Sequence, residues 1–196
     1  MKSRFLEQSE LTKLRAIMST EEFLPLWLSL ETGLRVGDVV SLKRSALKRD
    51  GVHYVAQKTG KRGVAQISSN LRSKLGGGSG YLFPSPYKVG QHLTRQAVWQ
   101  RIKRAGHRAG INLDGLSPHS MRKIFAVELY RAHGFEAVRE ALQHEYSSTS
   151  EIYAFADWDT GENAELPLKR KDLKLVVRMC LEALSNSPPS KKKEGN

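Results

Sequence analysis

The sequence contains one cysteine, no long apolar run and no apolar segment near its start. The single Cys180 excludes an internal disulfide and fits a reducing cytoplasm. No apolar stretch approaches the roughly 20 residues that a membrane-spanning helix needs. The opening stretch MKSRFLEQSELTKL also lacks the apolar centre of a signal peptide. We therefore expect a cytoplasmic protein without a membrane segment.

Several motifs of cofactor and metal enzymes are also missing. The sequence has no glycine-rich loop ending in Lys-Ser/Thr, no paired cysteines for zinc and no H-E-x-x-H motif. The glycines of LGGGSG lack the preceding strand and following helix that a dinucleotide site requires. If the protein is an enzyme, we expect it to work with its side chains alone, without a cofactor or metal.

The charge of the chain is strongly unbalanced. It has 32 lysines and arginines against 20 acidic residues, a net charge of +12. Such a surplus favours a polyanionic partner, DNA or RNA before an acidic membrane. The Pro/Ser-rich end SPPSKKKEGN is typical of a disordered basic tail, but its three lysines do not account for the surplus. The folded part is therefore expected to be basic as well.

Hydrophobic spacing predicts a mainly helical chain. A first helix is expected over 9–19 with Ser9 as its N-cap, and a second runs from Thr20, as its cap, to a stop near Gly33. Later helices are predicted at residues 92–109, 118–132, 134–143, 148–156 and 168–185.

Residues 51–68 differ from this pattern. Apolar and polar residues alternate on both sides of the turn KTGKRG, which predicts a β-hairpin. A short helical turn and a strand-like piece precede the hairpin, and LGGGSGYLFPSP follows as a turn-rich connector. The sequence thus predicts a single α+β domain, mainly helical, with a small three-stranded antiparallel sheet.

The remaining candidates for chemistry are basic residues and tyrosines. Arg35 follows the helix-ending glycine in TGLRVGD, and Lys58 begins the hairpin turn. His119 and Arg122 are three residues apart at a helix start, so they share one face near an end that favours anions. Taken singly, each could equally be an exposed charge, a helix-end residue or, for Tyr153, a half-buried aromatic.

Taken together, six residues resemble the catalytic pattern of tyrosine recombinases of the phage-integrase family. That pattern runs Arg, Lys, His-x-x-Arg, His, Tyr, and the matching residues here are Arg35, Lys58, His119, Arg122, His144 and Tyr153. Met121 stands where the family usually has leucine, and Gln143 where it usually has glycine. The resemblance implies an integrase-like catalytic domain over 1–185, followed by a disordered basic tail over 186–196.

The resemblance also implies roles for these residues in cutting DNA. Arg35 and Arg122 would clamp the phosphate, since each guanidinium can donate two parallel hydrogen bonds. Tyr153 would attack the phosphorus and form a 3′-phosphotyrosine with a free 5′-hydroxyl. His119 would be the base that accepts the phenol proton.

Three more residues would assist. Lys58 would protonate the leaving 5′-oxygen, His144 would hydrogen-bond the phosphate, and Asp38 would brace Arg35 or the fold around it. Residues expected to contact the DNA backbone are Arg95, Arg101, Lys103, Arg104, Lys61 and Arg62. A basic helix can instead be merely solvated, and that alternative stays open for this set.

The resemblance implies double-stranded DNA as partner, self-association on DNA as a synaptic tetramer, and an accessory DNA-bending protein as a further partner. The apolar face of the helix over 168–185 could dock on a neighbouring protomer or on its own domain. No N-terminal DNA-clamping domain is evident, so we expect a catalytic fragment or a reduced member of the family.

The expected function is integration or excision of a mobile element in a bacterial cell, with the protein in the cytoplasm or on the nucleoid. Two alternatives remain. A type IB topoisomerase shares the chemistry, and a basic DNA-binding regulator with a decayed site would bind without cutting. The presence of all six residues argues against decay.

Overall fold

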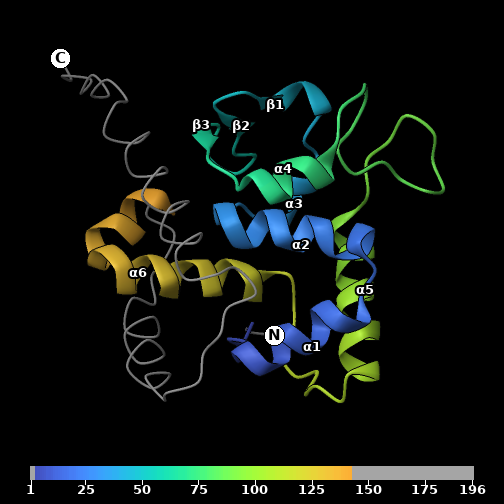
Figure 1. The fold of residues 1–196 in the computed structure, drawn as a ribbon, viewed down its shortest axis with the longest axis vertical. Helices are drawn as coiled ribbons and strands as arrows, with labels where there is room; N and C mark the ends of the chain where they lie inside the picture. The colour runs from blue at the N-terminus through green and yellow to red at the C-terminus, as the bar shows by residue number, and fades with distance from the viewer. Residues whose placement is uncertain (1–2, 143–196) are drawn as a thin grey trace.

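The computed structural model describes residues 3–142. Within this range, the predicted class is confirmed: helices dominate, and one small three-stranded antiparallel sheet accompanies them (Figure 1). The helices are α1 (Gln8–Ile17), α2 (Thr20–Thr32), α3 (Val36–Val40), the 3-10 turn η1 (Arg44–Ala46), α4 (Ser69–Leu75), α5 (Arg95–Arg108) and α6 (His119–Ala141). The strands are β1 (Leu47–Lys48), β2 (Gly51–Val55) and β3 (Arg62–Ala65). The helices predicted at 148–156 and 168–185, and the tail, lie outside the described residues.

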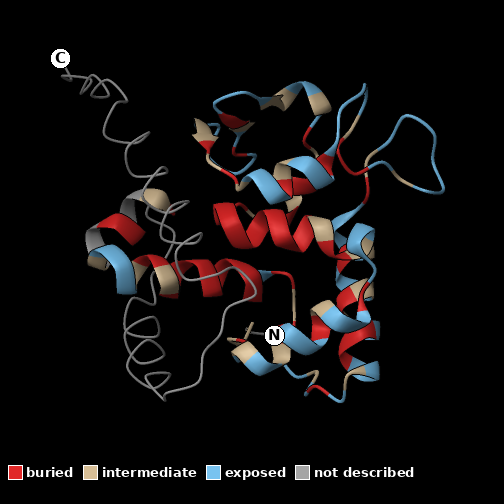
Figure 2. Ribbon diagram, in the orientation of Figure 1, coloured by how far each residue is buried: buried red, intermediate tan, exposed pale blue. Residues whose placement is uncertain are grey.

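Helix α2 forms the centre of the fold. It lies between α4 and the sheet on one side and α6 and α1 on the other (Figure 1), and it packs against α3, α4, α5 and α6. Every residue from Pro25 to Thr32 is buried, so most of the helix is coloured as buried in Figure 2. Because α2 is covered on all sides from Pro25 onward, the segment that follows it also begins inside the structure, where Leu34 and Val36 are buried.

Both N-caps predicted from the sequence are wrong by one or two residues. The N-cap of α2 is Ser19, whose hydroxyl accepts a hydrogen bond from the Glu22 N–H, rather than Thr20. The N-cap of α1 is Glu7, which forms a capping box with Glu10, whereas Ser9 already lies inside the helix. In each case the acidic residue three positions after the cap completes the box, and this pairing decides where the helix begins.

The end of α2 lies where two helices approach closely. Gly33 adopts a left-handed conformation with φ of 66°, as expected for a helix-ending glycine. A Cβ atom at this position would lie only 2.5 Å from Cδ1 of Phe125 on α6. Glycine therefore both ends α2 and lets α6 pack against its last turn.

The two helices predicted at 118–132 and 134–143 are confirmed. They make up α6, whose helical backbone is broken at Gly134, where φ is 78° and ψ is −173°. Helix α4 was not predicted, because its seven residues offer only one apolar pair, Leu71 and Leu75, before the glycines of the connector. Its N-cap is Ser68, which accepts from the Leu71 N–H.

The predicted hairpin is confirmed as β2 and β3, with β1 added on the other edge of β2. Val52 pairs with Ala65, and both side chains are buried. The turn is closed by a hydrogen bond of 2.8 Å from the Ala56 N–H to the Lys61 carbonyl. The buried pair fixes the register, so the turn, with Lys58 exposed on it, has a defined position.

None of the helices within residues 3–142 combines the length and the apolar character that crossing a membrane requires.

Candidate active site

Arg35 is positioned by the short link between α2 and α3. It is the N-cap residue of α3 and follows Gly33 by two positions. One carboxylate oxygen of Asp38, one turn on, lies 3.8 Å from the Arg35 guanidinium. Asp38 is almost completely buried, so it provides a fixed acidic partner for Arg35, in agreement with the role predicted from the sequence.

Asp38 also holds the hairpin. Its other carboxylate oxygen accepts a hydrogen bond of 2.9 Å from the backbone N–H of Gln57. The Gln57 side-chain amide donates to the Ser41 hydroxyl, also at 2.9 Å. Since Gln57 directly precedes Lys58, one buried carboxylate connects Arg35 with the turn that carries Lys58. Sequence reasoning missed this link, because nothing in the pattern pairs residue 38 with residue 57.

Arg122 reaches the same region from α6. Its side chain is buried, and its guanidinium donates hydrogen bonds to the backbone carbonyls of Gly33 and Leu142, the latter at 3.2 Å. Carbonyl oxygens carry no net charge, so these bonds orient the guanidinium without cancelling its positive charge. The bond to Gly33 holds Arg122 against the segment that carries Arg35.

His119 lies one turn before Arg122, with part of its side chain exposed to solvent and part of its ring covered. Partial burial of its ring lowers its pKa below the ordinary value of 6.5, and the positive charges of Arg122, Arg35, Arg95 and Lys123 lower it further. Such charge effects decay within a short distance in solvent, so His119 lies in the combined field of Arg35 and Arg122. A lowered pKa favours the neutral imidazole, which is the form that accepts a proton.

The structure brings three of the six predicted catalytic residues into one region. Arg35, His119 and Arg122 share an electrostatic environment, and Asp38 binds the backbone of Gln57, the residue before the exposed Lys58. His144 and Tyr153 lie outside the described residues. Leu142, the last described residue, lies beside Arg122, because its carbonyl accepts a hydrogen bond from the Arg122 guanidinium. The catalytic roles of all six residues stay predictions.

Most residues predicted to contact DNA lie at the surface. Lys61 and Arg62 are exposed in the hairpin, and Arg95 and Arg104 are exposed on α5. Arg101 is half-buried on the same helix. The charge of Arg95, at the start of α5, also lowers the pKa of His119, so Arg95 adds to the positive potential of the candidate site.

Lys103 differs from the other members of this set. Its ammonium group donates to the carbonyl of Leu113 and lies 5.7 Å from the centre of the Trp99 ring. The charge is thus already engaged in holding the loop after α5. The contact of Lys103 with DNA stays a prediction. In binding a phosphate, the ammonium group would have to give up its bond to the Leu113 carbonyl.

In residues 3–142, no group of three or more His, Cys, Asp or Glu residues is arranged to hold a metal ion. The expectation that the chemistry needs no metal or cofactor stays a prediction.

Comparison with known proteins establishes the family. Residues 4–158 match the Phage integrase family, and this chain belongs to that family. It is 38% identical over 144 residues to the tyrosine recombinase XerD of Vibrio cholerae, an alignment that covers 65% of this chain and 47% of XerD. The chain thus aligns with less than half the length of this relative.

Solved structures give the same fold. A post-cleavage complex of the recombinase XerH with a palindromic difH substrate aligns with a TM-score of 0.62 at 22% identity, over 82% of this chain and 51% of XerH. A lambda integrase tetramer bound to a Holliday junction aligns with a TM-score of 0.60 at 19% identity, over 76% of this chain and 49% of the integrase. At these identities the likeness establishes the fold alone.

Proposed function

We propose that this chain is the catalytic part of a tyrosine recombinase that cuts and rejoins double-stranded DNA at specific sites. The observation that carries the proposal is the meeting of Arg35 and Arg122 beside His119, where Arg122 is bound to the Gly33 carbonyl two residues before Arg35. Arg35 comes from the link after α2, Arg122 from α6, and both lower the pKa of His119. Two guanidinium groups and a base in one place match the needs of an attack on a phosphodiester.

In this mechanism Arg35 and Arg122 donate hydrogen bonds to the two non-bridging oxygens of the scissile phosphate. The negative charge on these oxygens grows as the attacking oxygen approaches. Because Asp38 and the Gly33 carbonyl hold the two guanidinium groups in advance, little reorganisation is needed in the transition state.

Tyr153 supplies the attacking oxygen. His119 accepts the phenol proton, the tyrosine oxygen forms a bond to phosphorus, and the bond from phosphorus to the 5′-oxygen breaks. Lys58 protonates the leaving oxygen, and His144 hydrogen-bonds the phosphate. The phosphotyrosine keeps the energy of the broken bond, so another 5′-hydroxyl can reverse the steps without ATP.

The finer part of the proposal concerns the biological reaction. We place it in integration or excision of a mobile element, in the cytoplasm of a bacterial host, with a tetramer of the protein on DNA and an accessory DNA-bending protein. The lambda integrase of similar fold was solved as a tetramer bound to a Holliday junction, which supports an assembly of this kind. A recombinase also accounts for the basic surface of α5 and the hairpin.

The test is covalent trapping on nicked duplex DNA. A pool of duplexes with a randomised core and a nick beside each candidate position releases a short strand after cleavage, so the covalent complex accumulates. We expect a protein–DNA band that survives denaturation, and sequencing of the trapped DNA should return one preferred core. The preferred core then serves for measuring the rate of cleavage.

Two variants identify the nucleophile. Tyr153→Phe should form no covalent complex while still binding the DNA, whereas Tyr146→Phe, which removes a nearby phenol, should cleave like the unmodified chain. Trapping without any preferred core would favour a topoisomerase. DNA binding without trapping would favour a non-catalytic regulator and overturn the proposal.

A further inference from the structure

The segment before α1 is bound to the start of α6 by hydrogen bonds. We name residues 3–6 the N-terminal strap. The backbone N–H of Arg4 donates a hydrogen bond of 3.0 Å to the Gly115 carbonyl, and the side chain of Leu6 is buried in the core. The strap therefore lies in a fixed position against the loop that leads into α6.

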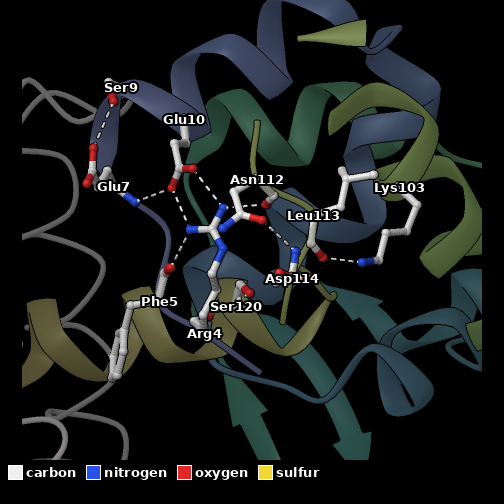
Figure 3. Close-up of polar contacts among 10 residues, drawn as sticks. All are labelled: Arg4, Phe5, Glu7, Ser9, Glu10, Lys103, Asn112, Leu113, Asp114 and Ser120. Atoms are coloured by element: carbon white, nitrogen blue, oxygen red, sulfur yellow. Dashed lines mark hydrogen bonds and ion pairs between the residues drawn. The ribbon is translucent and has the colours of Figure 1, made fainter. Parts of the chain in front are cut away.

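An ion pair anchors the strap on its other side. The Arg4 guanidinium donates two hydrogen bonds of 2.7 Å to the Glu10 carboxylate and one of 2.8 Å to the Asn112 carbonyl (Figure 3). Glu10 in turn accepts from the Glu7 N–H at the start of α1. One arginine thus joins the strap, α1 and the loop after α5, and a paired fork of this kind has little freedom to move.

Two side chains of α6 bind the strap backbone. The Ser120 hydroxyl donates to the Arg4 carbonyl at 2.8 Å, and the Lys123 ammonium donates to the Ser3 carbonyl at 2.7 Å. The same ammonium lies 4.4 Å from the centre of the Phe5 ring. Both side chains are buried, with relative exposures of 0% for Ser120 and 7% for Lys123.

The spacing of these residues matters for the candidate site. Ser120 and Lys123 are three residues apart on one face of α6, and each directly follows a proposed catalytic residue, His119 or Arg122. Successive helix residues are rotated by about 100°, so the two pairs project in different directions from the same turn. The strap therefore holds one side of the turn while Arg122 holds the other against Gly33.

Burial of Lys123 is expensive for a purely structural contact. An ammonium group taken out of water loses hydration that one carbonyl and one aromatic ring replace only in part, and methionine would fill the same space at a lower cost. What lysine adds is a directed bond to the strap and a positive charge beside the site.

We infer that Ser120 and Lys123 are positioning residues, and that the N-terminal strap sets the placement of His119 and Arg122 through them. This inference rests on the proposed function for its catalytic consequence. Small displacements of reacting groups are costly in such sites, so loosening the strap should slow cleavage more than it weakens DNA binding.

The test compares Ser120→Ala and Lys123→Met with the unmodified chain on the trapped core sequence. We expect both variants to lower the rate of covalent complex formation at saturating DNA, by about tenfold for Lys123→Met, with an unchanged Kd for the DNA. Arg131→Gln is the control, since it also removes one positive charge from α6 but lies beyond these turns, in an ion pair with Glu128. It should cleave at the normal rate.

Equal rates in all variants would overturn the inference, and so would parallel losses of rate and affinity. Thermal unfolding separates these results from misfolding, and Ser120→Ala, which removes one oxygen atom, is the variant expected to fold in any case.

A second readout keeps this test separate from that of the proposed function. If the unmodified chain forms no covalent complex, the proposed function fails, but the strap can still be examined through the NMR signal of the His119 ring in the free protein. Ser120→Ala should shift that signal while Arg131→Gln leaves it in place. An unmoved signal in Ser120→Ala would overturn the positioning role whatever the activity.

Discussion

Two arginines near the start of α6, Arg4 of the N-terminal strap and Arg122 of the helix itself, are held in different ways. On one side Arg4 donates to the Glu10 carboxylate, which neutralises its charge and raises its pKa, chiefly through those hydrogen bonds. On the other side Arg122 donates to backbone carbonyls, which fix its position and leave its charge to act on His119. Of these two arginines, the one bound to a carboxylate ties the structure together, and the one bound to carbonyls keeps its charge for the candidate site.

The largest effect is expected from Arg122→Met. Losing one preorganised donor to the phosphate should lower the cleavage rate by about 10²–10³-fold. The carbonyls of Gly33 and Leu142 would also lose a partner, which should lower the free energy of unfolding by about 1–3 kcal/mol. Trapping kinetics and urea unfolding measure the two effects.

The matched control is Arg44→Met. Arg44 also donates to two backbone carbonyls, those of Leu75 at 2.8 Å and Gly77 at 3.1 Å, but it lies outside the candidate site. We expect Arg44→Met to lose stability without losing cleavage. If Arg122→Met and Arg44→Met behaved alike in both measurements, Arg122 would be another structural tie.

A smaller effect is expected from Glu10→Gln, which breaks the pair on the Arg4 side. The pair is partly exposed, so the free energy of unfolding should fall by about 1 kcal/mol or less at pH 7. Burial alone would raise the pKa of Glu10, but the hydrogen bonds from Arg4 and the Glu7 N–H outweigh it and lower the pKa below 4.5.

The sign of the pH dependence follows from that lowered pKa. The contribution of the Glu10 carboxylate to stability is complete above pH 4.5 and is lost as the pH falls through the lower value of the folded state. Urea unfolding of the unmodified chain and Glu10→Gln should therefore differ at neutral pH and converge in acid. A difference that persisted in acid would show that the pair acts through its shape rather than its charge.

The smallest effect concerns the titration of His119. Partial burial and four cations lower its pKa below 6.5, so it should titrate at a lower pH than an exposed histidine in an NMR experiment. Arg95→Gln removes one of the cations and should raise this pKa, whereas Arg104→Gln, which removes an exposed cation farther along α5, should leave it unchanged. If His119 had the same pKa in both variants, the charge of Arg95 would not act on His119, and Arg95 would not belong to the candidate site.

The same lowered pKa predicts two pH effects in the unmodified chain. Below pH 6.5 the unfolded chain binds a proton at His119 more readily than the folded protein does, so the free energy of unfolding should decrease as the pH falls through this range. Cleavage should slow once the pH falls below the lowered pKa, because a protonated His119 cannot accept the phenol proton.

Much of the fold could be predicted because the patterns are local. The hairpin follows from alternation around a turn, and the end of α2 follows from Gly33, whose left-handed conformation only glycine adopts easily. The predicted caps, Thr20 and Ser9, were misplaced because the box with the glutamate three positions on decides where each helix begins, at Ser19 and at Glu7. Helix α4 was missed because seven residues carry too little periodic signal.

The candidate site also has one part that the sequence predicts and another that it does not. The order of Arg35, Lys58, His119 and Arg122 in the chain predicts that they act together, and the structure places Arg35, His119 and Arg122 in one region. The bond from Asp38 to Gln57 and the bonds from Ser120 and Lys123 to the strap join residues far apart in the sequence. A single sequence contains no signal for such pairs.

The chemical groups, the basic surface and the helical class could all be read from the chain, because they depend on residue type and on neighbours along the sequence. The fold alone selects which arginine is neutralised by a carboxylate and which is held by carbonyls. That choice depends on the group that the fold brings to each guanidinium, the Glu10 carboxylate of α1 to Arg4 and the Gly33 carbonyl at the end of α2 to Arg122. A guanidinium has the same hydrogen-bond donors in every protein, so its partners in the fold determine its function.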